Sequence, residues 1–392
     1  MDRCVVAGVG FHPFGKFLDK SLKDLGAVAV LEAVRDAGLA LSDIELAYVG
    51  NSYAGLTTGQ ESVRGQVILR HVGLSGIPVV NVENACASGA TALHQAAMAV
   101  GSGAAETALA LGVEKLFVGD TRKSIQALGT STDVETMGNR GVQFTALYAM
   151  KARQNMEDYG IPIEAVARVA VKNGRNGSLN PIAQFRKPHT IESVLSSRPI
   201  SEPLTLLMCS SIADGAAAAL LVSERKAREA GITRPVYVAG CGLRSGEYGR
   251  REGLVEANSV RAAANKAYDA AGIGPEDLDL LEVHDAAASS EMDHLDSLGI
   301  APIDQGYREL LAGRYDLQGE LPVNASGGLL SRGHPTGATG VAQVGEVVLQ
   351  LRGSAGKRQA RAGRSIRTGL CLNTGGRVED DRAAIAVTVL ST

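Results

Sequence analysis

Two stretches of this 392-residue chain repeat the same pattern in the same order, and this duplication constrains the fold more than any other feature of the sequence. Residues 4–10 (CVVAGVG) match residues 236–242 (VYVAGCG) at four of seven positions. Residues 33–38 then match residues 267–272, and the correspondence continues in the pairs Asp43 and Asp277, Leu46 and Leu280, and Val49 and Val283. Self-similarity in a fixed order is the sign of a repeated structural unit.

Each copy has the pattern of one α/β unit. A strand enters a glycine-rich turn, and an amphipathic helix, a terminal glycine and a second strand follow. A third match aligns residues 86–91 (CASGAT) with residues 334–339 (HPTGAT), and each precedes a helical pattern. We therefore predict an α/β fold of two units, each of about 120–150 residues. Gly8-Val-Gly10 is interpreted as turn structure and not as a dinucleotide-binding loop, because Pro13 stands where such a loop needs its third glycine.

One segment has no counterpart in the second copy. Residues 119–211 are more polar than their surroundings and contain Pro188, Pro199 and Pro203, which interrupt regular structure. We interpret this segment as an inserted loop domain. The predicted organisation is an N-terminal half (1–118 with 212–232), the loop domain (119–211) and a C-terminal half (233–392).

Composition excludes several classes of function. Apolar residues make up 45% of the chain and charged residues 21%, and the net charge is −3. These values are typical of a globular protein and provide no basic field that would recruit nucleic acid. The longest uncharged window, residues 84–105, is too polar for a membrane span. The five cysteines form no CxxC pair, so we expect neither a disulfide framework nor a zinc ribbon, and we expect a cytoplasmic location.

The duplication places a cysteine and a histidine at matching positions. Cys86 and His334 each stand at the start of a predicted helix, and a pseudo-twofold arrangement brings equivalent helix starts together. A helix N-terminus carries partial positive charge and free N–H groups, which lower the pKa of a thiol and stabilise an oxyanion. A neighbouring histidine is the usual base for a nucleophilic cysteine. We therefore predict that Cys86 is a nucleophile and His334 its partner.

Two further residues stand at predicted strand ends, where open α/β sheets place their sites. His284 ends the strand LLEVH, and Cys371 lies within or just after the strand GLCLN. For Cys371, packing and function remain equal alternatives at this point. The acidic and histidine residues near His284 match no zinc spacing, so we predict no metal site. Cys4, Cys209 and Cys241 are assigned to packing.

These motifs resemble those of the thiolase superfamily, and the resemblance extends over essentially the whole chain. Residues 84–89 (NACASG) look like the nucleophile motif, and residues 333–340 (GHPTGATG) look like the family's GHPxGxxG motif. His284-Asp285 resembles the HD motif of sterol-carrier-type and archaeal, acetyl-CoA acetyltransferase-like thiolases. The resemblance implies a five-layered α-β-α-β-α thiolase fold, a tight homodimer, and C–C bond cleavage or formation on acyl-CoA. It implies no bound cofactor, with coenzyme A as substrate or product.

The resemblance also implies roles for individual residues. Cys86 would be the acylated nucleophile, and His334 would activate it and line an oxyanion hole that His284 helps to hold. Cys371 would be the acid/base that moves the α-carbon proton. Backbone N–H groups of Cys86 and of the turn through Asn373, Gly375 and Gly376 would form a second oxyanion hole. Many of the 47 glycines lie near these residues, and we expect them to let the backbone approach the thioester.

Two departures from the family pattern affect the predicted function. Sterol-carrier-type thiolases often carry a cysteine after His-Asp, whereas this chain has Ala286, so the acid/base role falls on Cys371. Many thiolases have a Cys-x-Gly-Gly-Gly loop where this chain has Cys371-Leu-Asn-Thr-Gly-Gly376, followed by the polar residues 377–381. The Asn-x-Gly-Gly form is similar to thiolases that work with a small zinc-ribbon/OB-fold partner subunit.

We predict a thiolase-type acyl-CoA C-acyltransferase of lipid metabolism, as in β-oxidation, which cleaves a 3-oxoacyl-CoA or runs the reverse Claisen condensation. One alternative is a subunit that works with the small partner on an aromatic or branched 3-oxoacyl-CoA or another acyl acceptor. A second alternative is a non-catalytic lipid-carrier or scaffold subunit. A retro-aldolase would not need an acylatable cysteine, so Cys86 argues against it. Candidates for binding the CoA phosphates are Arg175, Arg186 and Lys187.

Overall fold

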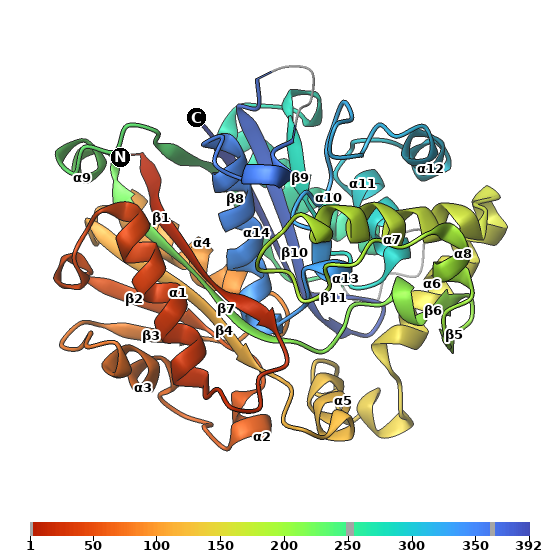
Figure 1. Ribbon diagram of the computed structural model, residues 1–392, viewed down its shortest axis with the longest axis horizontal. Helices are drawn as coiled ribbons and strands as arrows, with labels where there is room; N and C mark the ends of the chain where they lie inside the picture. The colour runs from red at the N-terminus through yellow and green to blue at the C-terminus, as the bar shows by residue number, and fades with distance from the viewer. Residues whose placement is uncertain (1–2, 248–254, 361–364) are drawn as a thin grey trace.

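Nine strands of this protein form one hydrogen-bonded sheet in a computed structural model that describes residues 3–247, 255–360 and 365–392 (Figure 1). Their order is β3-β2-β4-β7-β1-β8-β11-β10-β9. The strands of the first half are β1 (Cys4–Gly15), β2 (Leu46–Gly50), β3 (Val79–Val82), β4 (Thr107–Lys115) and β7 (Asp214–Ser223). Those of the second half are β8 (Val236–Arg244), β9 (Leu280–Glu282), β10 (Thr368–Val378) and β11 (Asp381–Ser391).

The two halves of the sheet meet at a short seam. β1 and β8 pair through only two positions, Val5 with Tyr237 and Val6 with Val236. On either side of this seam the order is mirrored, so that β7 corresponds to β11, β4 to β10 and β2 to β9. The predicted duplication is therefore present in the fold, and the equivalent strands are those that the sequence matches identify.

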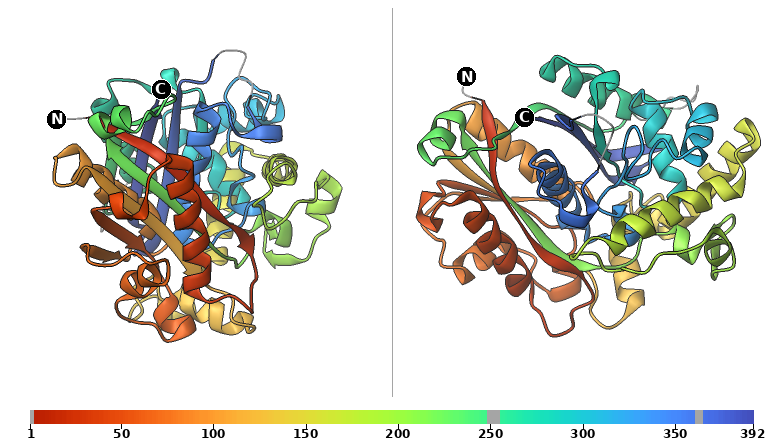
Figure 2. Two further views of the ribbon diagram at one scale, coloured as in Figure 1. Left: turned by 60° about the vertical axis from the view of Figure 1, so that its left-hand side comes forward. Right: turned by 45° about the horizontal axis from the view of Figure 1, so that its top comes forward.

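Helices cover both halves and also separate them. Contacts place α1 (Leu22–Ala37) on β1 and β7, and α10 (Val255–Ala271) on β8 and β11. Between the halves, α4 (Ser88–Gly101) packs against α14 (Thr336–Leu351), and α14 contacts strands of both halves. Figure 2 shows α14, in blue, between the red-to-green strands and the dark blue strands. The layers thus follow the order α-β-α-β-α that the family resemblance implies.

Glycines in β1 and β8 allow the outer helices to approach the sheet closely. A Cβ on Gly8 would lie 2.1 Å from the carbonyl oxygen of Ala33 in α1, and a Cβ on Gly240 would lie 2.1 Å from the equivalent oxygen of Ala267 in α10. The prediction that these glycines belong to a turn is wrong, because β1 runs uninterrupted from Cys4 to Gly15. Their physical role is to remove the side chain from a helix–strand contact.

The segment between β4 and β7 is largely helical. It contains α5 (Thr121–Gly129), α6 (Phe144–Tyr159), α7 (Ile163–Ser178), α8 (Ile191–Leu195), and the two-stranded sheet of β5 (Pro199–Ser201) and β6 (Leu204–Thr205). Ala165, Val166 and Val169 of α7 share one buried cluster with Leu281, Met292 and Tyr315 of the second half. The segment therefore has no core of its own and completes the core of the C-terminal half.

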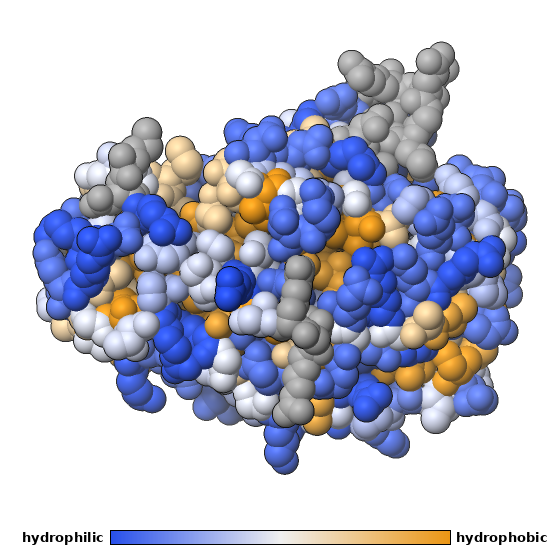
Figure 3. Space-filling model, turned by 90° about the horizontal axis from the view of Figure 1, so that it is seen from above, coloured by the Kyte–Doolittle hydropathy of each residue, from blue (hydrophilic) through white to orange (hydrophobic). Residues whose placement is uncertain are grey.

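Shorter helices complete the described structure: α2 (Ala54–Thr58), α3 (Arg64–His71), α9 (Glu224–Glu229), α11 (Ala288–Ser297), α12 (Ile303–Leu311) and α13 (Gly328–Ser331). Among the described residues, no helix combines the length and the apolar character needed to cross a membrane. Seen from above, the surface is mostly hydrophilic, with apolar residues in small patches between polar ones (Figure 3).

Candidate active site

A sharp backbone turn presents Cys86 just before α4. Ala85 adopts a left-handed conformation with φ of 47°, which is strained for a residue with a side chain. Two hydroxyl groups stabilise this turn, because Ser52 Oγ and Ser88 Oγ both donate to the carbonyl oxygen of Ala85, at 2.6 and 2.7 Å. The helix then begins at Ser88, two residues after Cys86. The thiol is therefore held at the helix start that the sequence predicts.

His334 occupies the equivalent position before α14, which begins two residues later at Thr336. Its Nδ1 lies 2.7 Å from Thr339 Oγ1, and that hydroxyl group donates to the carbonyl oxygen of Pro335 at 3.0 Å. Because the single hydroxyl proton is used there, Thr339 accepts a hydrogen bond from His334 Nδ1–H. The other ring nitrogen of His334, Nε2, is therefore the unprotonated one and can accept a proton.

His284 is held in the opposite tautomer by two amides. Gln343 Nε2 donates to the carbonyl oxygens of Leu372 and Glu282 at 3.1 and 3.4 Å, so its Oε1 must be the acceptor that faces Asn373. Asn373 Nδ2 donates to that oxygen and to His284 Nδ1, both at 3.0 Å. The proton of His284 is consequently on Nε2, which makes this nitrogen a hydrogen-bond donor.

Cys86, His284 and His334 converge on one point. The Cys86 Sγ atom and one ring nitrogen of each histidine lie within 4.8 Å of one another. The two rings meet edge to face, with centroids 5.0 Å apart and planes at 86°. Cys86 lies before the start of α4, His284 after the end of β9 and His334 before the start of α14. The predicted pseudo-twofold arrangement brings these three elements together. The same three atoms could ligate a metal ion, but a metal there would occupy the nucleophile.

Burial determines the protonation states of the three side chains. It raises the pKa of the Cys86 thiol to about 12, with the Glu114 carboxylate as the second cause. Burial also lowers the pKa of His334 to about 3, and burial together with His334 lowers the pKa of His284 well below its usual value. The expectation of a lowered cysteine pKa at the helix start is therefore not met. The resting site holds a neutral thiol between neutral imidazoles.

Cys371 is not a member of this group, and its acid/base role stays a prediction. It pairs with Thr388 of β11 and Glu282 of β9 and belongs to the buried cluster that packs against α14. Alternate residues of a strand share one face, so Asn373, two residues further along β10, takes the position beside His284. The described site therefore contains one thiol.

Two backbone N–H groups act on the Cys86 thiol. Those of Gly376 and of Cys86 itself oppose the rise of its pKa. Residues 373–376 are not a turn but part of the continuous strand β10. Gly376 has φ of 64°, a conformation that suits glycine and turns its N–H toward Cys86. A Cβ on Gly375 would meet the carbonyl oxygen of Asn84 at 2.2 Å, so this glycine permits packing against the Cys86 loop.

Most other glycines near the site pack protein against protein and do not line a space for a thioester. A Cβ on Gly89 would lie 2.3 Å from the carbonyl oxygen of Gly337, so the pair lets α4 and α14 touch. A Cβ on Gly328 would lie 2.2 Å from the Asp285 carboxylate. The predicted reason for the glycine content is therefore wrong at these positions, and close packing between the two halves is the physical cause.

Glu114 is a central residue that the sequence analysis missed. It is fully buried at the end of β4 and accepts hydrogen bonds from two different parts of the molecule. Thr336 Oγ1 and Gly337 N–H of α14 donate to it at 2.7 and 3.0 Å, and Asn51, Ser52 and Tyr53 after β2 donate at 3.0 to 3.2 Å. The sequence did contain a signal for this role, because Glu114 is a glutamate in an otherwise apolar predicted strand next to one of the matched repeats.

Asp285 holds the loop before His334. It is fully buried and accepts hydrogen bonds from Asn173 Nδ2 and from the backbone N–H of Leu329, both at 2.7 Å. Burial and the nearby Glu291 carboxylate raise the pKa of Asp285 to about 8. Glu291 in turn forms a buried ion pair with Lys172, 3.0 Å apart. The aspartate of the predicted HD motif thus positions α13 and does not face the thiol group.

Arg175, Arg186 and Lys187 all lie exposed on the inserted segment. The chain just before them runs beside the His334 loop, because the N–H groups of Gln184 and Phe185 donate to the carbonyl oxygens of Arg332 and Ser331 at 3.0 Å. Arg186 and Lys187 directly follow this contact, and Arg175 lies in α7.

Comparison with known proteins now identifies the family. The N-terminal thiolase domain model matches residues 4–225, and the thiolase C-terminal domain-like model matches residues 240–388. This chain belongs to the thiolase family, as its motifs predict. It is 42% identical over 374 residues to the acetyl-CoA acetyltransferase of Methanothermobacter thermautotrophicus, which covers 95% of this chain and 96% of the relative. Together with the fold, this likeness establishes the chain as an acyltransferase.

Other relatives span the same fold. The benzoylsuccinyl-CoA thiolase subunit BbsB of Thauera aromatica is 37% identical over 350 residues, 88% of each chain. Human sterol carrier protein 2 is 34% identical over 373 residues, 91% of this chain and 67% of the relative. The solved Ltp2-ChsH2(DUF35) aldolase superposes with a TM-score of 0.81 at 25% identity, covering 100% of this chain and 98% of that chain. Human mitochondrial 3-ketoacyl-CoA thiolase gives 0.77 at 17% identity, covering 100% and 99%.

Proposed function

We propose that the protein cleaves or forms the C–C bond of a 3-oxoacyl-CoA through an acyl-enzyme on Cys86. The observation that carries this proposal is the pairing of opposite tautomers around one thiol. His334 presents an acceptor nitrogen and His284 a donor N–H, within 4.8 Å of the Cys86 sulfur. Nucleophilic acyl transfer needs a base for the thiol and donors for the developing negative charge.

In the cleavage direction, the Cys86 sulfur attacks the 3-oxo carbon while its proton passes to His334 Nε2. The carbonyl oxygen takes negative charge beside the N–H groups of Cys86 and Gly376. The bond between C2 and C3 then breaks, which leaves a thioester on Cys86 and an enolate whose oxygen accepts a hydrogen bond from His284 Nε2–H. Because the described site has no second thiol, the proton on His334 is the one available to C2. Coenzyme A then takes the acyl group and restores the thiol.

Mass spectrometry of the intact protein tests the acyl-enzyme. Incubation with acetyl-CoA is expected to add one acetyl group to the protein, and a peptide digest should locate this group on Cys86. The Cys86→Ser variant should carry no acetyl thioester. A non-catalytic carrier or scaffold would stay unmodified. Absence of the adduct with short and long acyl-CoA, alone and with a partner subunit, would contradict the proposal.

We also propose that a small zinc-ribbon/OB-fold subunit assists turnover. Three observations support this: the Asn-x-Gly-Gly sequence at Asn373, the name of BbsB as a thiolase subunit, and the DUF35 component that is named in the solved aldolase complex. Acylation of Cys86 should occur in the single chain, whereas steady-state cleavage should rise when the subunit is added. Equal turnover with and without it would contradict this part.

A homodimer and a binding role for the exposed cations complete the proposal. β3 is an edge strand, and Val80 on it is 43% exposed, so a second copy could extend the sheet there. Light scattering should give twice the chain mass, and Val80→Lys should lower the measured mass.

The exposed Arg175, Arg186 and Lys187 would attract the phosphates of coenzyme A, and neutralising them should raise KM for CoA with little change in kcat. All five cysteines are free, which supports a cytoplasmic location.

A further inference from the structure

Tyr53 is a bulky side chain beside the catalytic thiol that takes no part in the proposed chemistry. It follows the end of β2, is only 2% exposed, and packs with Leu116 and Ala127 in a small apolar cluster. Its N–H donates to the Glu114 carboxylate at 3.2 Å. Burial raises the pKa of Tyr53 well above its usual value, and the charge of Cys86 is the next cause. The phenol is therefore neutral, fixed by packing, and close enough to the sulfur for their charges to interact.

A hydrogen bond ties this phenol to the inserted segment. The hydroxyl groups of Tyr53 and Ser131 bond to each other, and the carbonyl oxygen of Ser131 accepts the N–H of Arg377 at 2.8 Å. A Cβ on the preceding residue, Gly376, would lie 2.9 Å from that oxygen and 3.5 Å from the Cβ of Ala85, the residue before the nucleophile. Tyr53, Ser131 and Gly376 consequently form one wall of the space around the thiol.

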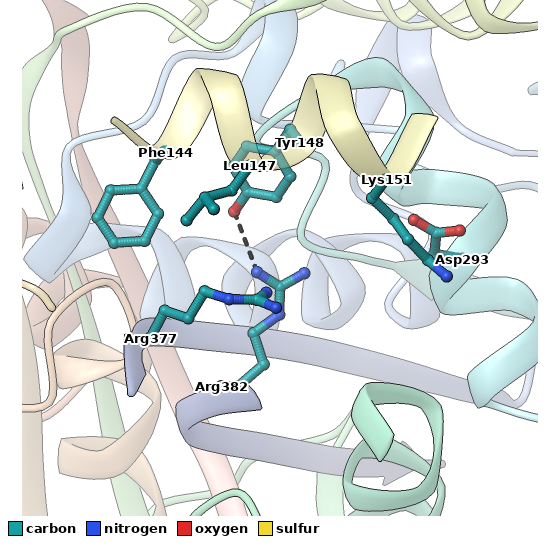
Figure 4. Close-up of a pocket in the computed structure, with 7 residues that line it drawn as sticks. All are labelled: Phe144, Leu147, Tyr148, Lys151, Asp293, Arg377 and Arg382. Carbon is teal, nitrogen blue, oxygen red and sulfur yellow. Dashed lines mark hydrogen bonds between the residues drawn. The ribbon is translucent and has the colours of Figure 1, made fainter. Parts of the chain in front are cut away.

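This wall is anchored at a second place on the β10–β11 hairpin. The side chains of Arg377 and Arg382 lie below α6 of the inserted segment, and Arg382 Nη1 donates to the Tyr148 hydroxyl at 3.4 Å (Figure 4). Thr132, next to Ser131, also pairs with Arg377 through a backbone bridge. Because the inserted segment is bound to the hairpin on both sides of this bridge in sequence, we expect Ser131 to keep its position when an acyl group is present.

The proposed chemistry assigns three of the four directions around the attacked carbon. The sulfur comes from Cys86, and the oxygen faces the N–H groups of Cys86 and Gly376. The departing C2 faces His284 and His334, whose nitrogens lie within 4.8 Å of the thiol. A tetrahedral carbon then has one direction left for the acyl chain that begins at C4. The wall that contains Tyr53 lies on the side of the thiol that the other groups leave for this chain.

We propose that Tyr53, held by Ser131, limits the length of the acyl group that Cys86 accepts, so that the substrate is a short-chain 3-oxoacyl thioester whose 3-oxo carbon bears no more than a methyl or ethyl group. This inference rests on the proposed function and narrows it to a substrate class. A longer chain would have to displace a buried phenol, and a close-packed interior yields only at a cost in free energy. A single methylene changes kcat/KM by about 10- to 200-fold when a pocket is built around the group.

Mass spectrometry of the intact protein tests this limit, because the mass of the adduct gives the length of the acyl group on Cys86. The whole protein, with any partner subunit present, is incubated with acetyl-CoA or with hexanoyl-CoA, and the rate of adduct formation is followed. We expect the acetyl adduct to form about 10- to 200-fold faster. Tyr53→Ala is expected to bring the two rates within about 3-fold of each other through a gain with hexanoyl-CoA. A variant that is merely destabilised would show no such gain.

Three further variants separate the size of the side chain from other effects. Tyr53→Phe keeps the ring and should retain the preference for the acetyl group, whereas Tyr53→Leu keeps apolar contacts with less volume and should reduce it. Tyr268→Ala removes another buried tyrosine, in α10, whose hydroxyl donates to the carbonyl oxygen of Leu298 at 3.0 Å. This matched control should lower stability without changing the preference. Circular dichroism shows which variants are folded.

Three results would overturn the inference. The first is an unmodified protein that takes up hexanoyl and acetyl groups at equal rates. The second is a folded Tyr53→Ala or Tyr53→Leu variant that keeps the full preference of the unmodified protein. The third is a preference that Tyr53→Phe loses as completely as Tyr53→Ala, since the hydroxyl group and not the size would then be decisive. Absence of any adduct from either acyl-CoA is distinct from these, because the proposed acyl-enzyme itself would have failed and the inference with it.

Discussion

Asn373 stands beside His284 at the centre of this site and determines which tautomer that histidine adopts. Its side-chain amide bridges Gln343 and His284 and thereby fixes the proton of His284 on Nε2. The oxygen of the same amide is buried and has no hydrogen-bond partner among the described residues. An unsatisfied acceptor of this kind is costly, so we expect a bound water or a donor of the substrate to meet it.

Exchange of the two β10 residues separates their roles. Asn373→Ala is expected to lower kcat about 10- to 100-fold, because His284 loses the donor that fixes its tautomer. Cys371→Ala is expected to leave kcat within about 2-fold and to lower the free energy of unfolding by about 1 kcal/mol through lost packing. Steady-state kinetics and urea titration measure both. Loss of turnover in Cys371→Ala with an intact fold would restore Cys371 as the acid/base.

Alkylation of Cys86 should report its protonation state. With the pKa of the thiol near 12, the reactive thiolate fraction rises about ten-fold per pH unit across the range in which the protein can be studied. The rate of iodoacetamide labelling at Cys86 is thus expected to climb from about pH 7 to about pH 9.5 without a plateau, as followed by mass spectrometry. A plateau beginning near pH 6 would show a thiolate–imidazolium pair and contradict a neutral resting site.

The sequence predicted those site residues that the duplication marks. Cys86 and His334 could be paired because they align in the two copies and both precede helices. Cys371 could not be placed, because face alternation along β10 becomes meaningful only once its neighbours β9 and β11 are known. Glu114 and Arg382 were missed for a related reason. Their partners lie 222 residues away in the chain for Glu114 and 234 for Arg382, and no local pattern reports such contacts.

At the scale of single elements, the fit of α1 against β1 depends on the absence of side chains. Gly8→Ala would place a Cβ only 2.1 Å from the carbonyl oxygen of Ala33, and we expect a loss of about 3 kcal/mol in unfolding free energy. Gly101→Ala, at the end of α4, meets no atom within 4 Å and should be neutral or slightly stabilising. Equal effects of the two variants in denaturant titration would contradict this packing argument.

Glu114 joins β4 of the first half to the start of α14 in the second. Replacing it by alanine would leave its Asn51, Thr336 and Gly337 donors without an acceptor, and we expect a loss of about 4 kcal/mol. Glu106→Ala serves as the control: this partly exposed glutamate just before the same strand pairs with Ser223 and Arg225 near the surface and should change stability little. Urea titration checks both, and a Glu114→Ala variant as stable as the control would refute the linking role.

At the scale of the whole molecule, the inserted segment and the C-terminal half share one core. Residues 233–392 expressed alone are therefore expected to lack a cooperative unfolding transition, because α7 no longer covers Leu281 and Met292. Co-expression with residues 1–232 should restore a soluble complex with one thermal transition. Cooperative unfolding of the isolated C-terminal piece, seen by calorimetry or circular dichroism, would show that its core is self-sufficient.

The sequence predicted the architecture of those parts of the chain that the internal repeat covers. Strand and helix order within each half follows from hydrophobic periodicity and from the collinear matches, so the layers could be expected. The behaviour of the inserted segment could not, because its apolar residues identify a buried face without naming the partner of that face. Only the folded structure shows that Val169 shares one buried cluster with Leu281 of the second half as well as with Leu204 of the segment's own β6.

The matched positions of Cys86 and His334 also bear on how such a site can arise. A twofold axis between two identical chains places the same residue type on both sides, so it offers two cysteines or two histidines but never one of each. Joining the two units in a single chain lifts that restriction, since each copy can then mutate alone. The two units that meet at the short seam between β1 and β8 can therefore carry a proton donor at one matched position and a proton acceptor at the other.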